Sequence, residues 1–278
     1  MMRPQDSHDL RLHSATLEVD PPPQTTRWAH DVFGNSICLM EWPRDVRTNR
    51  LSIISRVELT QYPAGPALPR ATLDPAAEIF PFSYAADEVP DLARLAERQV
   101  PHPGRVVDAW MHRFLGPAGN PRTPNLLETV TQAVKSDFTY CSRTAEGTQT
   151  PAETLERGSG TCRDFALLMM EAVRSLGLAA RFVTGYLYDT GTQQAKGGGA
   201  THAWCSVYLP GAGWVEYDPT NGLVAGANLI RVGSTRTPEQ ALPIAGGFVG
   251  DPSDPLPLTV DVTSEVLPAP GGTSGGQG

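Results

Sequence analysis

Positive charge is scarce in this sequence of 278 residues. Lys and Arg number 22 against 30 Asp and Glu, which gives a formal net charge of −8, and no run of basic residues departs from that average. Phosphate backbones and anionic membrane surfaces attract clusters of Lys and Arg. We therefore expect neither nucleic acid nor a membrane among the partners of this chain.

Long apolar segments are also missing. Residues 1–12 are polar and of mixed charge, without the apolar region of a secretory signal. The most apolar helical stretch, residues 165–176, contains Glu171 and Arg174 and is too short to span a bilayer. These features predict a cytoplasmic protein.

Cysteines are few and widely spaced. The four of them, Cys38, Cys141, Cys162 and Cys205, form no Cys-x-x-Cys pair, so the sequence suggests neither a zinc site nor a disulfide framework. We expect no metal and no cofactor. In a reducing compartment a lone cysteine can persist as a thiol, which leaves room for a reactive one.

The first part of the chain has the pattern of β structure. Apolar and polar residues alternate over 10–19 and 36–42, and a β-branched run follows at 51–59. Turn residues separate these segments, in keeping with a total of 27 Gly and 26 Pro. Residues 1–80 are therefore predicted to form a small antiparallel β domain.

Beyond residue 80 the pattern changes to helices and then to strands. Apolar spacing predicts helices and strands in the rest of the chain, and a tail over 269–278 rich in Gly, Ser and Thr is predicted to be disordered. Helices followed by strands indicate an α+β domain over 81–268. The predicted helices span 90–99, 105–115, 124–138 and 161–176, and the predicted strands span 180–188, 202–209, 213–218 and 258–262.

Cys162 has the surroundings of a nucleophile. It opens the best-defined helix, directly after Gly158-Ser159-Gly160-Thr161, and Thr161 and Asp164 have the spacing of a capping box. Unpaired N–H groups and the positive end of the helix dipole favour a thiolate there and could stabilise an oxyanion. The plainer alternative is a small buried apolar side chain.

His202 and Asp218 could complete a catalytic triad. His202 follows the glycine-rich stretch 190–200, which we expect to be a flexible loop or lid, and it opens a strand. In a hairpin with residues 213–218, both side chains can share one face. The carboxylate would then accept the Nδ1–H bond and orient the imidazole as a general base. A structural histidine and a turn-forming aspartate are the alternatives.

Four motifs in order identify a family. The segments GTCRDFA (160–166), RFVTGYL (181–187), HAW (202–204) and EYDPTN (216–221) resemble the transglutaminase-like superfamily of bacterial cysteine proteases. DVFGN (31–35) and its surroundings resemble the bacterial transglutaminase-like N-terminal domain. The resemblance covers about residues 85–268 and implies a papain-like core, helices on an antiparallel sheet, with a Cys162–His202–Asp218 triad. The resemblance also implies that Tyr140 lies near the active site, and an oxyanion role for Tyr140 is one expectation.

Several neighbours of the triad could shape a substrate cleft. Trp204, Trp214 and Tyr217 could line it or belong to the core, and Arg163 could bind a substrate carboxylate or be solvated. Cys205 should face away from His202 and serve in packing.

The leading hypothesis is a cysteine-dependent hydrolase that acts on peptide or isopeptide amides through a thioester. The alternatives are a protein-glutamine γ-glutamyltransferase type of acyl transferase, a non-catalytic peptide-binding module and, more remotely, a metal site that uses Cys162 and His202. The expected partner is a peptide or amide substrate. An uncovered strand edge in the N-terminal β domain could also support a homo-oligomer.

Overall fold

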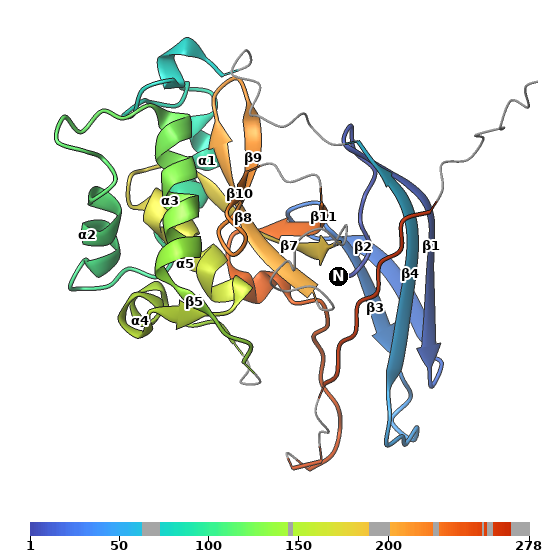
Figure 1. The fold of residues 1–278 in the computed structure, drawn as a ribbon. Coiled ribbons are helices and arrows are strands. Elements are labelled where there is room, and N and C mark those ends of the chain that lie inside the picture. The colour runs from blue at the N-terminus through green and yellow to red at the C-terminus, as the bar shows by residue number, and fades with distance from the viewer. Residues whose placement is uncertain are drawn as a thin grey trace, which may run out of the picture.

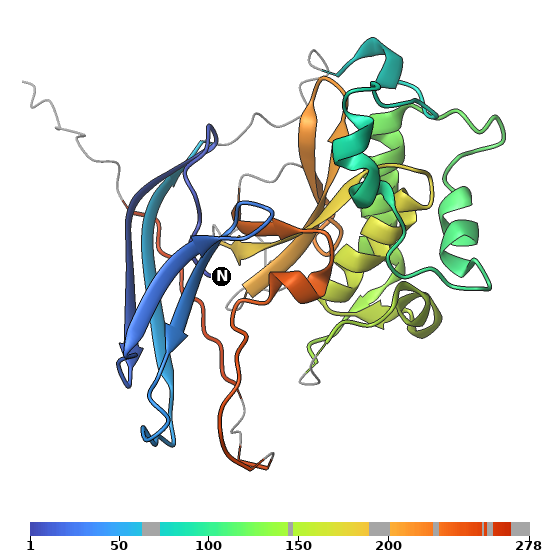
Figure 2. The same cartoon turned by 180° about the vertical axis from the view of Figure 1, so that it is seen from behind.

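The computed structural model describes residues 1–62, 73–143, 147–188, 201–224, 228–251, 253–254 and 258–267. A five-stranded sheet lies in the middle of the molecule, with the helices on one side and a smaller four-stranded unit on the other (Figures 1 and 2). The predicted disordered tail and the predicted loop over 190–200 lie outside the described residues.

The N-terminal unit consists of two antiparallel strand pairs. β1 (Leu10–Asp20) pairs with β4 (Ser52–Gln61), and β2 (Thr25–His30) pairs with β3 (Ser36–Glu41). The expected β structure is confirmed, although β2 was not predicted. Only three side chains within residues 1–62 are buried, namely Pro4, Leu10 and Asn35. The unit therefore has almost no hydrophobic core of its own, and the predicted boundary at residue 80 stays a prediction.

The helical layer packs around one central helix. α5 (Cys162–Arg174) is buried at every residue except Arg163, and it contacts the sheet and the helices around it. The four predicted helices are confirmed with slightly different ends, and α4 was not predicted. The other elements of this layer are η1 (Pro75–Ala77), α1 (Val89–Ala96), α2 (Val106–His112), α3 (Thr123–Asp137), β5 (Thr139–Tyr140), α4 (Pro151–Arg157) and β6 (Ser159–Gly160).

The central sheet has the strand order β10-β9-β8-β7-β11, and all its neighbouring strands are antiparallel. Three of its strands match the prediction, while β11 was missed. No strand occurs at 258–262, contrary to prediction, and Leu258 is 70% exposed there. The strands are β7 (Ala180–Leu187), β8 (Thr201–Leu209), β9 (Gly213–Asp218), β10 (Leu223–Val224) and β11 (Leu229–Thr235), and η2 (Pro238–Ala241) follows.

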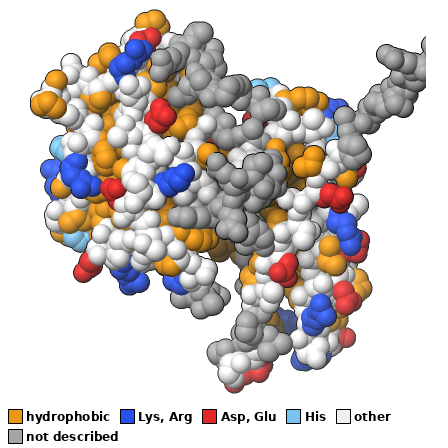
Figure 3. Space-filling view, in the orientation of Figure 1, with side chains coloured by type: hydrophobic (Ala, Val, Ile, Leu, Met, Phe, Trp, Pro, Cys, Tyr) orange, Lys and Arg blue, Asp and Glu red, His pale blue; other side chains and the backbone are white. Residues whose placement is uncertain are grey.

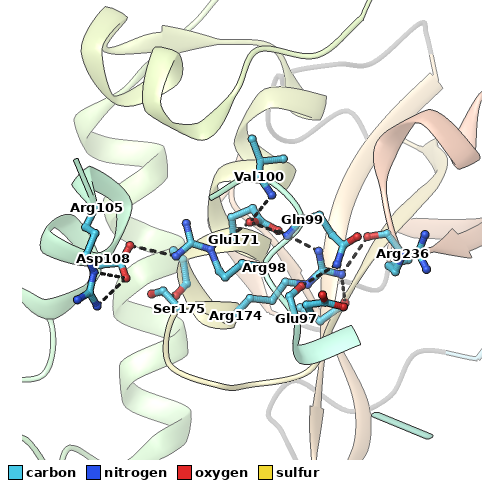
Figure 4. Close-up of polar contacts among 12 residues, drawn as sticks. Glu97, Arg98, Gln99, Val100, Arg105, Asp108, Glu171, Arg174, Ser175 and Arg236 are labelled. Atoms are coloured by element: carbon cyan, nitrogen blue, oxygen red, sulfur yellow. Dashed lines mark hydrogen bonds and ion pairs between the residues drawn. The ribbon is translucent and has the colours of Figure 1, made fainter. Parts of the chain in front are cut away.

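Two charged residues in the middle of the core are paired. Glu171 and Arg174, one turn apart on α5, form an ion pair of 3.0 Å. Glu171 also accepts hydrogen bonds from Arg98 and from the backbone of Gln99 and Val100 (Figure 4). Burial of a charge is tolerated when it is paired and hydrogen-bonded. This network joins the segment after α1 to the C-terminal half of α5.

The N-terminal unit is fastened to the edge of the central sheet. Asn35 donates its side-chain amide to Ser234 O of β11 and accepts from Ser234 N, both at 2.9 Å. Gln61 donates to Leu229 O at 2.8 Å, and Arg231 pairs with Asp9. β11 is the last strand of the sheet, so these contacts use an edge that would otherwise be unpaired.

Charged side chains of both signs are scattered over the face drawn in Figure 3. Among the described residues on that face, Lys and Arg do not gather into a continuous patch. This distribution agrees with the acidic composition of the chain.

Candidate active site

The segment directly before Cys162 is held by a short parallel strand pair. Thr139 lies opposite Ser159, Tyr140 lies opposite Gly160, and Cys141 N donates to Gly160 O at 3.0 Å. The pairing brings Tyr140 beside the start of α5, and Cys162 is the first residue of that helix. The Cys162 side chain is 7% exposed.

A buried carboxylate fixes the first turn of α5. Asp164 is 0% exposed and closes the predicted capping box with Thr161, whose backbone N–H donates to Asp164 Oδ2 at 2.8 Å. Gln149 donates to the same carboxylate through its backbone N at 2.7 Å and its side chain at 3.0 Å. Arg143 completes the set with two bonds of 3.1 and 3.2 Å. We call these four residues the Asp164 clamp.

The Asp164 clamp uses some of the backbone N–H groups at the start of α5 and leaves others without an acceptor. Thr161 N donates to Asp164, and Asp164 N donates to Thr161 Oγ1 at 3.4 Å. The first N–H groups of a helix lack partners within the helix. Within the described part of the chain, the N–H groups of Cys162 and Arg163 have no acceptor. A donor is therefore available at the thiol itself.

His202 and Asp218 form a buried pair. His202 Nε2 lies 2.9 Å from Asp218 Oδ2, and the two side chains are fully buried. Asp218 also accepts from Thr220 N at 2.9 Å and from the side chain of Asn221 at 2.8 Å. His202 stacks on Trp204 with 5.9 Å between ring centroids. The orientation of the imidazole is fixed from two sides.

The nitrogen that meets the carboxylate differs from the expectation. The prediction gave Asp218 the Nδ1–H bond, whereas the structure gives it Nε2. Tyr217 lies opposite Cys205 at the end of the β8–β9 ladder, so Asp218 follows directly after the last paired position and meets His202 through Nε2. Nδ1 is buried and makes no hydrogen bond of ordinary geometry within the described residues. It is the ring nitrogen left for Cys162.

The charges in this pair reinforce each other. Burial disfavours the imidazolium, but the Asp218 carboxylate and the nearby Cys162 thiol outweigh it and raise the pKa of His202 to about 10. Burial likewise opposes the carboxylate, but His202 and Asn221 hold the pKa of Asp218 below its ordinary value. At neutral pH the two groups therefore exist as an ion pair.

Tyr140 is electrostatically close to the thiol. Its pKa is raised, first by burial and then by the negative charge that Cys162 and Cys141 can carry. The tyrosine is half-buried.

The other predicted neighbours have mostly structural roles. Trp204 and Tyr217 are fully buried in the core, so neither lines a cleft. The Arg163 guanidinium lies 4.9 Å from the centroid of the Phe182 ring and donates to Pro238 O at 2.6 Å. Arg163 therefore helps to pack η2 against the core. Cys205 packs in the main core and donates to Tyr217 O, which confirms its predicted packing role.

Trp214 is half-buried and belongs to a different set of contacts. The Arg181 guanidinium lies 3.7 Å from the centroid of its indole ring. The aromatic residues of the hairpin therefore do not form one common surface.

Two members of the Asp164 clamp were not predicted. Arg143 and Gln149 lie outside the helices and strands, and no local signal in the sequence points from them to Asp164. Asn221 stood within the recognised segment 216–221, but its contact with Asp218 was not foreseen. The T-x-x-E pattern of Thr150 and Glu153, with Pro151 between them, could have revealed α4, because it is a capping box with Pro at the first helical position.

No group of three or more His, Cys, Asp or Glu side chains that could hold a metal occurs among the described residues. Across the same residues, no helix has the length and apolarity needed to cross a membrane.

Comparison with known proteins finds a matching family for each of the two units. Residues 109–219 match the Transglutaminase-like superfamily, and residues 1–59 match the Bacterial transglutaminase-like N-terminal region. An uncharacterized protein of Mycobacterium tuberculosis is 29% identical over 285 residues, which cover 97% of this chain and 86% of that protein. An uncharacterized protein of Mycobacterium leprae is 31% identical over 133 residues, 46% of each chain.

A solved structure supports the fold. The crystal structure of a "Putative Cysteine Protease" from Cytophaga hutchinsonii aligns with a TM-score of 0.61 at 17% identity, over 86% of this chain and 76% of that one. The predicted α+β class, with a papain-like transglutaminase core behind a small β unit, is confirmed.

Proposed function

We propose that this chain, which carries a transglutaminase-like core behind a bacterial transglutaminase-like N-terminal region, is a cysteine-dependent hydrolase of peptide or isopeptide amides. The observation that carries the proposal is the buried 2.9 Å contact between His202 Nε2 and Asp218 Oδ2. It leaves Nδ1 for Cys162, which stands at the start of α5. Cys162 is then the nucleophile, His202 the acid and base, and Asp218 the residue that orients the imidazole.

In the first half of the reaction the Cys162 thiolate attacks the amide carbonyl carbon and forms a tetrahedral intermediate. The His202 imidazolium, favoured by Asp218, donates its proton to the leaving nitrogen. The C–N bond breaks, the amine leaves, and a thioester remains on Cys162. His202 is neutral at this point.

The negative oxygen of the intermediate needs donors close to the thiol. The Cys162 backbone N–H has no other acceptor within the described residues and meets this need. The Tyr140 hydroxyl is our candidate for a second donor, because the β5–β6 pair brings Tyr140 beside the start of α5 and Tyr140 interacts electrostatically with Cys162.

In the second half, water attacks the thioester while neutral His202 accepts its proton. The C–S bond breaks, the carboxylic acid leaves, and the thiolate–imidazolium pair returns. An amine in place of water would make the same enzyme an acyl transferase, because both reactions share the thioester. No metal or cofactor takes part in the proposed reaction. The cytoplasmic location and a homo-oligomer through the N-terminal unit stay predictions.

The test measures turnover and the fate of the acyl group together. Purified protein is incubated with a library of peptides and isopeptides, with and without hydroxylamine, and the products are identified by mass spectrometry. We expect free carboxylic acids without hydroxylamine and hydroxamates with it. Both products should be lost in Cys162→Ala and kept in Cys38→Ala, which removes a thiol from the N-terminal unit.

Two results would contradict this proposal. Transamidated products that dominate over hydrolysis in the presence of physiological amines would identify a transferase. Stoichiometric peptide binding without turnover, unchanged in Cys162→Ala, would identify a binding module.

A further inference from the structure

We propose that Arg143 and Asp164 are paired positioning residues for Cys162. The Asp164 carboxylate fixes the turn that carries the thiol, and the Arg143 guanidinium cancels the negative charge that this carboxylate brings to the nucleophile. The inference rests on the proposed function, because it concerns the state of Cys162 as a thiolate.

The geometry gives Asp164 more than an ordinary capping role. Its two oxygens receive six donors, from Arg143, Gln149 and Thr161. These donors come from Arg143 and Gln149 on one side and from the residue directly before Cys162 on the other. The carboxylate therefore ties Arg143 and Gln149 to the turn that carries Cys162.

The space around Asp164 is as restricted as its bonding. A Cβ built on Gly160 would lie 2.9 Å from the Asp164 Cβ and 3.2 Å from Gln149 Nε2. Contacts below 3.0 Å are closer than real Cβ atoms come. Gly160, two residues before Cys162, therefore leaves the space that Asp164 and Gln149 occupy in the Asp164 clamp.

The charge on Asp164 has an electrostatic consequence. The carboxylate is buried two residues from Cys162, and a like charge disfavours an anion, most of all where solvent is excluded. Arg143 approaches through two nitrogens, in the planar arrangement that suits a carboxylate. The Arg143–Asp164 pair has a net charge close to zero. It therefore fixes the turn without placing a net negative charge beside the Cys162 thiolate.

Other charged or titratable groups act on the same thiol and must stay unchanged in any test. His202 acts on it from β8, Tyr140 from β5 and Arg163 from α5 itself, while Asp218 acts on His202 and Cys141 acts on Tyr140. Glu239 of η2 acts on Arg163. The substitutions proposed below alter none of these side chains.

The test follows the alkylation of Cys162 by iodoacetamide as a function of pH, with each thiol quantified by peptide mass spectrometry. Arg143→Met leaves the carboxylate uncompensated, so the pH of half-maximal Cys162 alkylation should rise. Asp164→Asn removes the charge, so the same midpoint should fall. We expect shifts of about half a pH unit or more, which correspond to about threefold in rate at a fixed pH below the midpoint.

The matched control is Glu153→Gln. Glu153 closes the equivalent capping box on α4, and Gln keeps that box while it removes the charge. The variant therefore tests the loss of a capping carboxylate on another helix, and it should leave the Cys162 midpoint unchanged. Cys38 in β3 serves as an internal reference whose profile should not move in any variant. The double variant Arg143→Met/Asp164→Asn should return toward the wild-type midpoint.

The outcomes separate the two proposals. If wild-type Cys162 reacts no faster than Cys38 at pH 6, the proposed function fails. If wild-type Cys162 passes that test but both single variants shift in the same direction, or neither shifts, the clamp has only a structural role and the inference is overturned. If Asp164→Asn does not fold, Arg143→Met decides alone, and an unchanged midpoint there refutes the inference.

Discussion

Asn35 in the N-terminal unit pairs with the backbone of a single residue, Ser234, as an additional strand would. Its side-chain amide donates to Ser234 O and accepts from Ser234 N, both at 2.9 Å. The same amide nitrogen also donates to Asp31 Oδ2 at 2.8 Å, which fixes its orientation. The neighbouring Gly233 leaves the space, since a Cβ there would lie 3.1 Å from Asn35 Oδ1. The N-terminal unit thus covers this part of the β11 edge of the central sheet with the Asn35 side chain.

Asn35→Ala should therefore weaken the attachment of the whole N-terminal unit. It leaves the backbone N–H and C=O of Ser234 without partners in a buried place, and each such group costs about 1–3 kcal/mol. We expect the free energy of unfolding to fall by about 2–6 kcal/mol, as measured by urea denaturation. Gln5→Ala, which removes an exposed hydrogen bond to Gly34 O, is the control and should have little effect. A fall below 0.5 kcal/mol in Asn35→Ala would show that Asn35 does not fasten the units.

A second prediction concerns the bulge in β11. Gly185 of β7 lies where the β11 register shifts between Arg231 and Gly233. A Cβ on Gly185 would come within 2.1 Å of Ile230 O, a backbone atom that cannot move aside. Gly185→Ala should destabilise the fold by about 3 kcal/mol or more, because overpacking against backbone forces the strands apart. Gly246→Ala, in open space, should be neutral, and equal melting temperatures for the two variants would contradict this account.

A third prediction concerns the buried network of α5. Glu171→Ala leaves Arg174 buried without its carboxylate and removes the acceptor of Gln99 N and Val100 N. Removing one member of a buried ion pair costs about 3–5 kcal/mol. Hydrogen exchange at the Val100 amide should accelerate more than exchange in the N-terminal strands. Uniform acceleration across the protein would indicate a global effect without local coupling.

The fourth prediction follows from the His202–Asp218 ion pair. The pKa of His202 rises from 6.5 to about 10 in the folded protein, so its contribution to stability is fully present below pH 6.5 and is lost as the pH rises toward 10. The pKa of Asp218 is lowered from 3.8, so its contribution is present above that value and is lost in acid. Stability should therefore fall between pH 7 and pH 10.

Asp218→Asn removes the charge that raises the pKa of His202, so the fall in stability between pH 7 and pH 10 should be smaller in this variant. Turnover should have an alkaline limit that moves to lower pH in Asp218→Asn, because His202 must be protonated to donate to the leaving group. Denaturation curves and pH–rate profiles of the two proteins test both statements. An alkaline limit at the same pH in both would refute the assigned role of Asp218.

Local signals in the sequence were sufficient for the centre of the fold. The capping box at Thr161 and Asp164 and the apolar spacing after it predicted α5 and placed Cys162 at its start. The turn at 210–212 predicted the hairpin that brings His202 and Asp218 to one face. Each of these features depends on residues close in the chain, which is why they could be read without tertiary information.

Features that depend on partners distant in the chain could not be predicted from the sequence. The bulge between Arg231 and Gly233 interrupts the alternation of β11, so the edge strand carried no clear pattern. Residues 258–262 alternate well but have no partner strand among the described residues, and alternation alone does not form a sheet. Arg143 meets Asp164 across 21 positions of sequence, and Asn35 meets Ser234 across 199. Such contacts arise from the packed fold.

The central claim is that Cys162 and His202 act together, and one measurement tests it most directly. The rate of Cys162 alkylation by iodoacetamide is followed from pH 5 to pH 9 in the wild type and in His202→Asn, with Cys38 as the reference thiol in the same sample. We predict that wild-type Cys162 reacts readily at pH 6 while Cys38 does not, because the imidazolium sustains the thiolate. This advantage should disappear in His202→Asn. A Cys162 profile that follows Cys38 in the wild type, or that is unchanged in His202→Asn, would contradict the account.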